Sequence, residues 1–288
     1  MFGRRYLAAH LIRCWAGSPR WRWLEQERQQ DVCGFFHSTG GLHVNLSPAE
    51  KERYARQLGA GVLSEEGQLN LRRSTALVTR VGGMGGPAAL MLTMAGVGRV
   101  IIAHGGDLIS PDLNRQVLGS EAVIGQPRAP HFADYLRSMN RFVEVDYVDH
   151  EPSDSEALEL VRKSNIVLSC PPTFAERLRL NRAATEAGIP LIDAAQWGMT
   201  GTMMVVRAGL TACLQCVYPQ PPPFEEFFPV VGAISSAIGS LAALEAIKIL
   251  SGTGHPLFGK MLTYDGFQGR ATTMELTRAV DCPCCGNL

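Results

Sequence analysis

A strand that runs through glycines into an apolar helix, at residues 75–98, constrains this chain more than any other feature. The stretch reads TALVTRVGGMGGPAALMLTMAGVG. A strand that enters a helix in this way brings bare backbone N–H groups to the positive end of the helix dipole, which suits a nucleotide phosphate. Taken alone, the pattern also fits a tight strand–helix turn without a ligand, so its meaning depends on the neighbouring sequence.

The residues that follow alternate between short apolar strands and helices. Strands are expected at residues 99–103, 142–148, 165–169 and 189–193. Helices are expected at residues 126–140, 153–163 and 174–187. Because the links between them are short, these elements predict a Rossmann-like α/β fold, in which helices cover both faces of a mostly parallel sheet.

The last third of the chain has a different pattern. The strands expected there, at residues 202–207, 260–264 and 271–276, are not separated by regular helices, which predicts an antiparallel portion of the sheet. A Pro-rich loop at 218–229 and a helix at 232–250 lie between them. That helix is interrupted by Gly, Ser, Glu245 and Lys248, so we interpret it as a buried helix and not as a membrane span.

Composition excludes some classes of partner. The chain has 27 basic and 27 acidic side chains, a formal net charge of zero, and 46% hydrophobic residues. A hydrophobic fraction of this size can build a core, and the balanced charge gives no electrostatic reason to expect nucleic acid or a membrane surface as partner. We therefore predict a globular α/β protein that binds neither.

The start of the chain is unlike the rest. Residues 1–24 contain five arginines, three tryptophans and no acidic residue. Such a start is typical of a transit peptide, and the alternatives are a flexible basic extension or a start codon assigned too far upstream. We predict that residues 1–46 lie outside the fold and that residues 47–288 form one domain, which begins with a helix capped by Ser47 and Glu50.

Two CxxC pairs, Cys213/Cys216 and Cys282/Cys285, use four of the eight cysteines. No secretory signal of the usual shape precedes them, so the expected compartment is the cytoplasm, where such pairs favour a metal over a disulfide. Four thiolates suit tetrahedral zinc and leave no open coordination position, which predicts a structural site. Cys284 is an alternative ligand, and four unmetallated buried thiols are the other possibility.

Several short motifs follow one another in a fixed order. They are RYARQ at 53–57, GGMG at 82–85, AGVG at 95–98, LNRQ at 113–116, VIGQPR at 123–128 and IGSLAALEAIK at 238–248. In this order, and with both CxxC pairs, the chain resembles the ThiF/MoeB/HesA family over residues 47–288. These proteins are bacterial relatives of ubiquitin-activating enzymes. Their typical activity is to adenylate the C-terminal glycine of a small ubiquitin-like protein with ATP and Mg²⁺.

The resemblance implies roles for individual residues. The residues implied for nucleotide binding are Gly82, Gly83, Gly85, Asp112 and Arg128. The residues implied for catalysis are Arg56, Arg115 and Asp107, with Arg56 donated across a dimer interface. The family's C-terminal pattern also favours Cys282 and Cys285 over Cys284 as zinc ligands. The ordinary alternatives are surface salt bridges for the arginines and solvated loop acids for the two aspartates.

Three departures from the family pattern fall on the expected ATP site. Arg80 occupies the first glycine of the loop, where its side chain would either pair with phosphates or fill their place. His104 and two glycines replace the acidic DxD end of the second strand, so that Asp107 lies one residue late. Pro172 stands where the family has its magnesium-binding Asp, and a proline side chain cannot bind a cation.

Two functions are compatible with these observations. The first is an adenylyltransferase that activates the C-terminal glycine of a ubiquitin-like sulfur carrier or a peptide, with ATP, Mg²⁺ and structural zinc as cofactors. The second is a non-catalytic member that binds a carrier or peptide, or forms the silent half of a heterodimer. The resemblance implies a dimer in both cases, either of two identical chains or with a related subunit.

Overall fold

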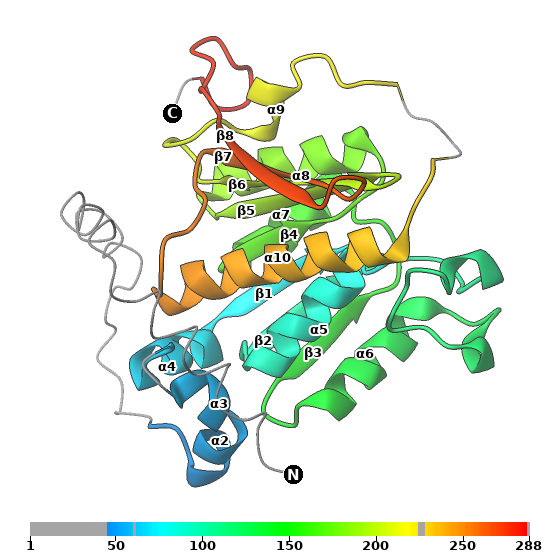
Figure 1. The fold of residues 1–288 in the computed structure, drawn as a ribbon, viewed down its shortest axis with the longest axis vertical. Helices are drawn as coiled ribbons and strands as arrows, with labels where there is room; N and C mark the ends of the chain where they lie inside the picture. The colour runs from blue at the N-terminus through cyan, green and yellow to red at the C-terminus, as the bar shows by residue number, and fades with distance from the viewer. Residues whose placement is uncertain (1–44, 60–61, 224–227, 287–288) are drawn as a thin grey trace, which may run out of the picture. The chain divides into compact units, whose positions relative to one another are not determined.

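The strand order of the sheet places the glycine turn at the centre of the protein. The computed structural model describes residues 45–59, 62–223 and 228–286, so most of the predicted extension lies outside the described residues. The eight strands are ordered β3-β2-β1-β4-β5-β6-β7-β8 (Figure 1). Because the strand order reverses direction between β1 and β4, a crevice is expected beyond their carboxyl ends.

Five strands are parallel and three are antiparallel, as the sequence predicts. The parallel strands are β1 (Thr75–Thr79), β2 (Arg99–Ala103), β3 (Glu144–Val148), β4 (Ile166–Ser169) and β5 (Leu191–Trp197). The antiparallel strands are β6 (Thr200–Val206), β7 (Lys260–Asp265) and β8 (Arg270–Glu275). β5 runs four residues beyond its predicted end because residues 194–197 pair with β6 through a turn at Gly198, whose φ is 56°.

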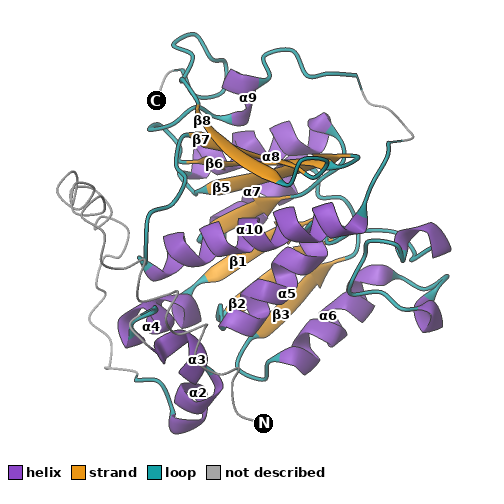
Figure 2. Ribbon diagram, in the orientation of Figure 1, coloured by secondary structure: helices purple, strands orange, loops and turns teal. Residues whose placement is uncertain are grey.

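Helices cover both faces of the sheet (Figures 1 and 2). On one face lie α5 (Gly85–Ala95), α6 (Arg128–Met139) and α10 (Gly232–Ser251). On the other lie α7 (Asp154–Arg162), α8 (Phe174–Ala187) and α9 (Leu214–Val217). Alternate residues of β1 serve the two cores, since Val78 packs with the first set and Leu77 with the second.

Three short helices precede the sheet: α2 (Pro48–Arg53), α3 (Ala55–Leu58) and α4 (Glu65–Arg73). The predicted capping box at the start of α2 is present between Ser47 and Glu50. The sequence predicts one helix to about residue 59, but the structure divides it into α2 and α3 at Tyr54. This residue is buried, and its hydroxyl accepts a hydrogen bond from Asn140. Two short 3₁₀ turns, Ser110–Asp112 and Glu121–Val123, interrupt the loop between β2 and α6.

α10 is long and apolar enough, by length and composition, to cross a membrane. Half of this apolar stretch is nevertheless buried, and the helix packs on α4, α5 and the central strands. Its buried acid, Glu245, accepts a hydrogen bond from the backbone N–H of Leu257 and forms an ion pair with Lys248. This is the packing of a core helix. A core helix can match a membrane span in length and apolar composition.

The two ends of α5 have different surroundings. Its last carbonyls are satisfied locally, because Gln57 and Gln68 both donate to Ala95 O, at 2.9 and 3.0 Å. Its first turn begins at Met84, which offers no side-chain hydrogen bond to the free N–H groups there. The helix therefore points its uncapped, positive end at the carboxyl edge of the sheet.

Candidate functional site

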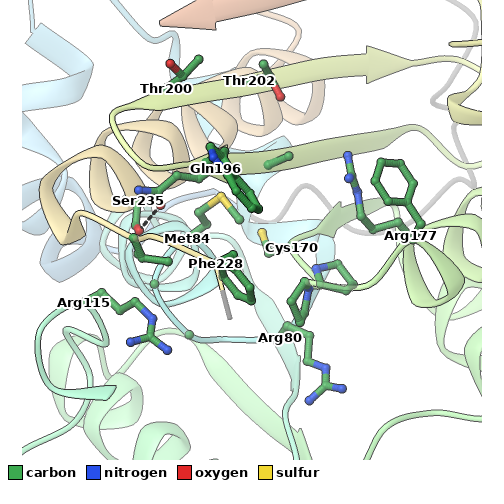
Figure 3. Close-up of a pocket in the computed structure, with 18 of the residues that line it drawn as sticks. Arg80, Met84, Arg115, Cys170, Arg177, Gln196, Thr200, Thr202, Phe228 and Ser235 are labelled. Carbon is green, nitrogen blue, oxygen red and sulfur yellow. Dashed lines mark hydrogen bonds between the residues drawn. The ribbon is translucent and has the colours of Figure 1, made fainter. Parts of the chain in front are cut away.

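A cavity of about 600 Å³ lies at the carboxyl ends of β1, β2 and β4. Residues that follow these strands form its base, and residues of β5, β6 and the segment after α9 form the other walls (Figure 3). This is the place where open α/β sheets bind their ligands. Pockets that bind small molecules have volumes of roughly 300–1,000 Å³, so a cavity of this size suits a small molecule.

The glycine turn forms one end of the cavity, lined by Gly82 and Gly83. A Cβ on Gly83 would lie 3.0 Å from the Ser235 hydroxyl and 3.3 Å from Arg115 Cδ. A Cβ on Gly85 would lie 2.5 Å from the carbonyl oxygen of Arg80, so only glycine fits there. The turn therefore needs glycines for its own packing, and it also brings the uncapped start of α5 to the cavity.

Arg80 neither plugs the cavity nor leaves its charge unpaired. Its φ is 55°, the one positive value for a non-glycine residue in the described chain. The guanidinium donates to both carboxylate oxygens of Glu176, at 2.5 and 2.8 Å, and to Glu151 at 3.2 Å. Figure 3 shows the side chain directed away from Cys170 and Phe228. The two alternatives expected from the sequence are thus replaced by a third, an ion pair with α8.

Asp112 is held between two arginines. Arg115 and Arg128 approach its two carboxylate oxygens, each at 3.2 Å, and the side chain is almost wholly buried. Arg128 also donates to Gly106 O at 3.1 Å and to the Gln116 side chain at 3.2 Å. Of the three charged residues, Arg115 alone lines the cavity. Asp112 and Arg128 hold the loop after β2 in place.

The other two residues predicted to be catalytic lie away from the cavity. Asp107 is exposed, and its backbone oxygen accepts a hydrogen bond from Arg128. Arg56 is exposed on α3, between Tyr54 and Gln57, which both contact the C-terminal end of α5. The cavity lies at the N-terminal end of that 11-residue helix, about 16 Å along its axis. One chain does not bring Arg56 to its own cavity.

His104 is the most perturbed group at the cavity. It is 8% exposed, and its Nδ1 atom has no hydrogen-bond partner among the described residues. Burial lowers its pKa to about 3, helped by the nearby charges of Arg128, Arg80 and Arg115. The imidazole is therefore neutral at physiological pH. Its place directly after β2 was the sequence signal for a ligand-facing side chain.

Sequence reasoning missed Arg177, a second arginine that lines the cavity. Its guanidinium pairs with Asp193, which also accepts a hydrogen bond from Ser169 at 3.1 Å. The same guanidinium stacks on the Phe174 ring at 4.4 Å. Parallel pairing of β4 with β5 sets Ser169 opposite Asp193, and no local sequence pattern indicates this contact.

The wall after β4 carries no group that could bind a cation or act as a nucleophile. Burial raises the pKa of the Cys170 thiol to about 12, which disfavours the reactive thiolate. Pro171 and Pro172 follow it and line the cavity. No Asp or Glu occurs among the described residues that line it.

Four cysteines form a separate cluster, away from the cavity. The sulfurs of Cys213, Cys216, Cys282 and Cys285 all lie within 4.8 Å of one another. Three of the separations are 3.9, 3.7 and 3.4 Å, and a tetrahedral zinc site with Zn–S bonds of about 2.3 Å has edges of about 3.8 Å. Cys284 lies outside this group, and its sulfur accepts a hydrogen bond from Asn181 at 3.1 Å. The cluster could therefore hold a metal ion with the predicted ligands.

The profile of the ThiF family matches residues 54–284. The chain belongs to the ThiF family. It is 38% identical to the HesA protein of heterocysts from Trichormus variabilis over 245 residues, which cover 85% of this chain and 92% of that protein. It is 36% identical to the adenylyltransferase and sulfurtransferase MOCS3 of Sus scrofa over 247 residues, which cover 84% of this chain and 54% of MOCS3.

Solved structures confirm the fold expected of a ThiF-family chain. Escherichia coli MccB, crystallised with MccA-N7isoASN, superposes with a TM-score of 0.74 at 21% identity, over 84% of this chain and 76% of MccB. MccB with ATP superposes with a TM-score of 0.71 at 20% identity, over 81% and 74% of the two chains. The resemblance inferred from the ordered motifs is thus confirmed, and the protein is adenylyltransferase-like.

Proposed function

We propose that this ThiF-family chain adenylates the C-terminal glycine of a small ubiquitin-like sulfur carrier, or of a peptide, with ATP. The observation that carries the proposal is one cavity with two unlike ends. In the reaction a carboxylate oxygen attacks the α-phosphorus, the bond from this phosphorus to the bridging oxygen breaks, and pyrophosphate leaves. The product is an acyl adenylate. MOCS3 is named for adenylyl transfer, and MccB has been crystallised with ATP and with MccA.

The first end of the cavity suits phosphate. Gly82 and Gly83 expose backbone where the positive end of α5 points, and Arg115 lies beside them. Backbone N–H groups and a guanidinium are strong donors for phosphate oxygens. The role of these residues is to position the nucleotide and to neutralise charge in the transition state.

The second end suits a peptide. Trp197, Tyr218 and Pro222 contribute apolar side chains to the lining. Thr200 and Thr202 of β6 line the same space, and Figure 3 shows both on the strand above Gln196. Apolar walls with hydroxyl groups on one side can hold the C-terminal residues of a partner and lead its carboxylate to the nucleotide.

We propose a dimer in which Arg56 reaches the cavity of the partner. The position of Arg56, one helix length away from its own cavity, supports this arrangement. α5 and α10 are largely apolar, and Met94 and Leu244 remain 42% and 50% exposed. Apolar helix faces of this kind favour contact with a second copy.

We also propose that the four-cysteine cluster holds structural zinc. Bound there, zinc would join the segment around α9 to the C-terminal segment. Cys213 and Cys282, one ligand from each segment, are 69 residues apart in the sequence. Four thiolate ligands leave no position for a reacting water, so the ion would supply stability and no catalytic chemistry.

A second function, a non-catalytic binding subunit, is favoured by one specific observation. The wall at Pro171 and Pro172 has no cation ligand, and Arg80 is tied to Glu176. Such a chain would bind the carrier or lend Arg56 to an intact relative without turning over ATP. The two functions make different predictions for exchange of pyrophosphate.

The deciding experiment is ATP–pyrophosphate exchange with the small Gly-Gly-ending proteins of the same organism. The adenylyltransferase proposal expects carrier-dependent entry of labelled pyrophosphate into ATP, reduced about tenfold or more by Arg115→Ala. Arg162→Ala, on the exposed face of α7, is the matched control and should leave exchange unchanged. Carrier binding without exchange would establish the binding subunit instead.

A further inference from the structure

The charged groups at the cavity do not match the metal that the family implies. Magnesium in nucleotide sites is held by one or two carboxylates together with the phosphates. The described residues that line this cavity include Arg80, Arg115 and Arg177, and no carboxylate. At the end of β4 the cavity meets Pro171 and Pro172, whose side chains have no donor atom.

The acids nearest to the cavity are already used. Each is buried and paired with a different arginine behind the cavity wall. These pairs are Glu176 with Arg80, Asp112 with Arg115, and Asp193 with Arg177. Thr173 and Ser169 also donate hydrogen bonds to the first and last of these acids. To bind a cation, Asp193 would have to leave Arg177 buried without a partner, which is costly. Glu176 and Asp112 would have to give up their ion pairs with Arg80 and Arg115.

One of these pairs leaves donors for an anion. Arg177 uses Nε and Nη2 on Asp193, and no hydrogen bond joins its Nη1 group to another described residue. The first turn of α5 has no side-chain cap and adds the N–H of Gly85, while Gly86 donates to Gly82 O at 2.9 Å and Pro87 has no N–H. His104 lines the cavity as well, with its unpartnered Nδ1 atom. A neutral imidazole can donate to a ligand oxygen or accept from a ligand hydroxyl.

We propose that this cavity binds its nucleotide without a divalent cation, and that guanidinium and helix N–H groups hold the phosphates in place of Mg²⁺. The inference rests on the proposed nucleotide site but not on turnover. It identifies the ligand as the metal-free nucleotide anion, and it assigns Arg177 to the site beside Arg115.

The test is titration calorimetry of the full-length protein with ATP, once in EDTA and once in excess MgCl₂. We expect ATP to bind in EDTA at least as tightly as in MgCl₂. Tightening by Mg²⁺ of about tenfold or more would overturn the inference. Arg177→Lys should weaken binding in EDTA about tenfold, because a lysine ammonium cannot both pair with Asp193 and reach the ligand. Unchanged affinity in this variant, with circular dichroism confirming its fold, would also count against the inference.

Pro172→Asp is the gain-of-function variant. It puts a carboxylate on the cavity wall, and we expect Mg²⁺ to tighten ATP binding to it about fivefold or more. Lack of any Mg²⁺ effect in this variant would contradict the position that we assign to the phosphates. ATP binding in neither buffer would overturn the inference outright. Mg²⁺-dependent binding by the natural protein would overturn it while leaving the adenylyltransferase proposal intact, which pyrophosphate exchange tests separately.

Discussion

At the scale of single residues, Arg80 shows how the fold accommodates a side chain at a glycine position. Its left-handed backbone costs roughly 1 kcal/mol for a non-glycine residue. In return the guanidinium neutralises Glu176, which is buried in the first turn of α8. The pair joins residues 96 positions apart in the sequence. Because Glu176 is buried, loss of Arg80 would leave its carboxylate charge without this partner.

We predict that Arg80→Gly destabilises the protein despite relieving the backbone. An unpaired buried carboxylate costs about 3 kcal/mol, and the relieved strain returns about 1, so the net loss is about 2 kcal/mol. Urea unfolding measures this loss. The double variant Arg80→Gly/Glu176→Gln removes the buried charge as well and should recover about half of the loss or more. A double variant no more stable than Arg80→Gly would contradict the explanation.

His104 makes a second residue-scale prediction, for the dependence of stability on pH. Its folded pKa of about 3 lies below the ordinary 6.5, so the unfolded chain binds the extra proton as pH falls below 6.5. Stability is therefore lost as pH falls, from about 6.5 down to about 3. Between pH 7 and pH 5 the loss through this group is about 2 kcal/mol. The His104→Gln variant should therefore lose about 2 kcal/mol less stability than the natural protein between pH 7 and pH 5, as measured by urea unfolding at each pH. Identical dependence of stability on pH in the two proteins would refute the lowered pKa of His104.

At the scale of elements, the two CxxC segments are small and depend on each other. α9 has four residues, and the C-terminal cysteines lie in a segment of turns. Elements this short bury little apolar surface by themselves, so the contacts among their four sulfurs position them. Ala279, on the C-terminal side, donates its N–H to Cys216 Sγ at 3.5 Å, as backbone groups commonly do around metal-bound thiolates.

The prediction at this scale compares two neighbouring cysteines. Cys282→Ser should fail to bind the zinc that we propose for this cluster and lower the free energy of unfolding by about 2 kcal/mol or more, since it removes one of the four sulfurs. Cys284→Ser should retain the metal, because Cys284 is not one of the four clustered sulfurs and its own sulfur contacts Asn181 and Thr185. Metal content by plasma emission spectrometry and thermal unfolding are the measurements. Equal metal loss in both variants would show that Cys284 is a ligand.

At the scale of the whole molecule, the outer faces of α5 and α10 are the surface through which we propose that two copies of the chain associate. Both helices pack on the sheet, yet Leu244 and Met94 stay about half exposed. A dimer over this face would cover them and would bring Arg56 of one chain toward the other. The assembly would then complete a site that a single chain leaves incomplete.

We predict that Leu244→Glu converts a dimer into a monomer with the fold retained, since the new charge would be buried at the interface. Sedimentation velocity measures the change in mass, and circular dichroism monitors the fold. Leu210→Glu changes a residue that is 66% exposed in the loop between β6 and α9, outside the proposed interface, so this control should remain dimeric. Dissociation by the control alone would place the interface elsewhere.

The sequence by itself determined the features that depend on local chemistry. Hydrophobic periodicity and short links predicted the parallel sheet, its flanking helices and the antiparallel end, all of which the structure confirms. The ordered motifs predicted the ThiF family, and the paired CxxC spacing predicted the four sulfurs that come together. These inferences succeed because each rests on residues within one element or one short motif.

Tertiary structure alone decided what the charged residues do. Arg80 meets Glu176, and Arg177 meets Asp193, through contacts across strands and helices that no local pattern encodes. Asp112 lies between two arginines, while Asp107, five residues earlier in the chain, stays exposed. A charge acts on whatever lies within a few ångströms of it, and for these residues the neighbours come from distant parts of the chain. The sequence shows which ionisable groups are present, and only the folded chain shows which of them remain to face a ligand.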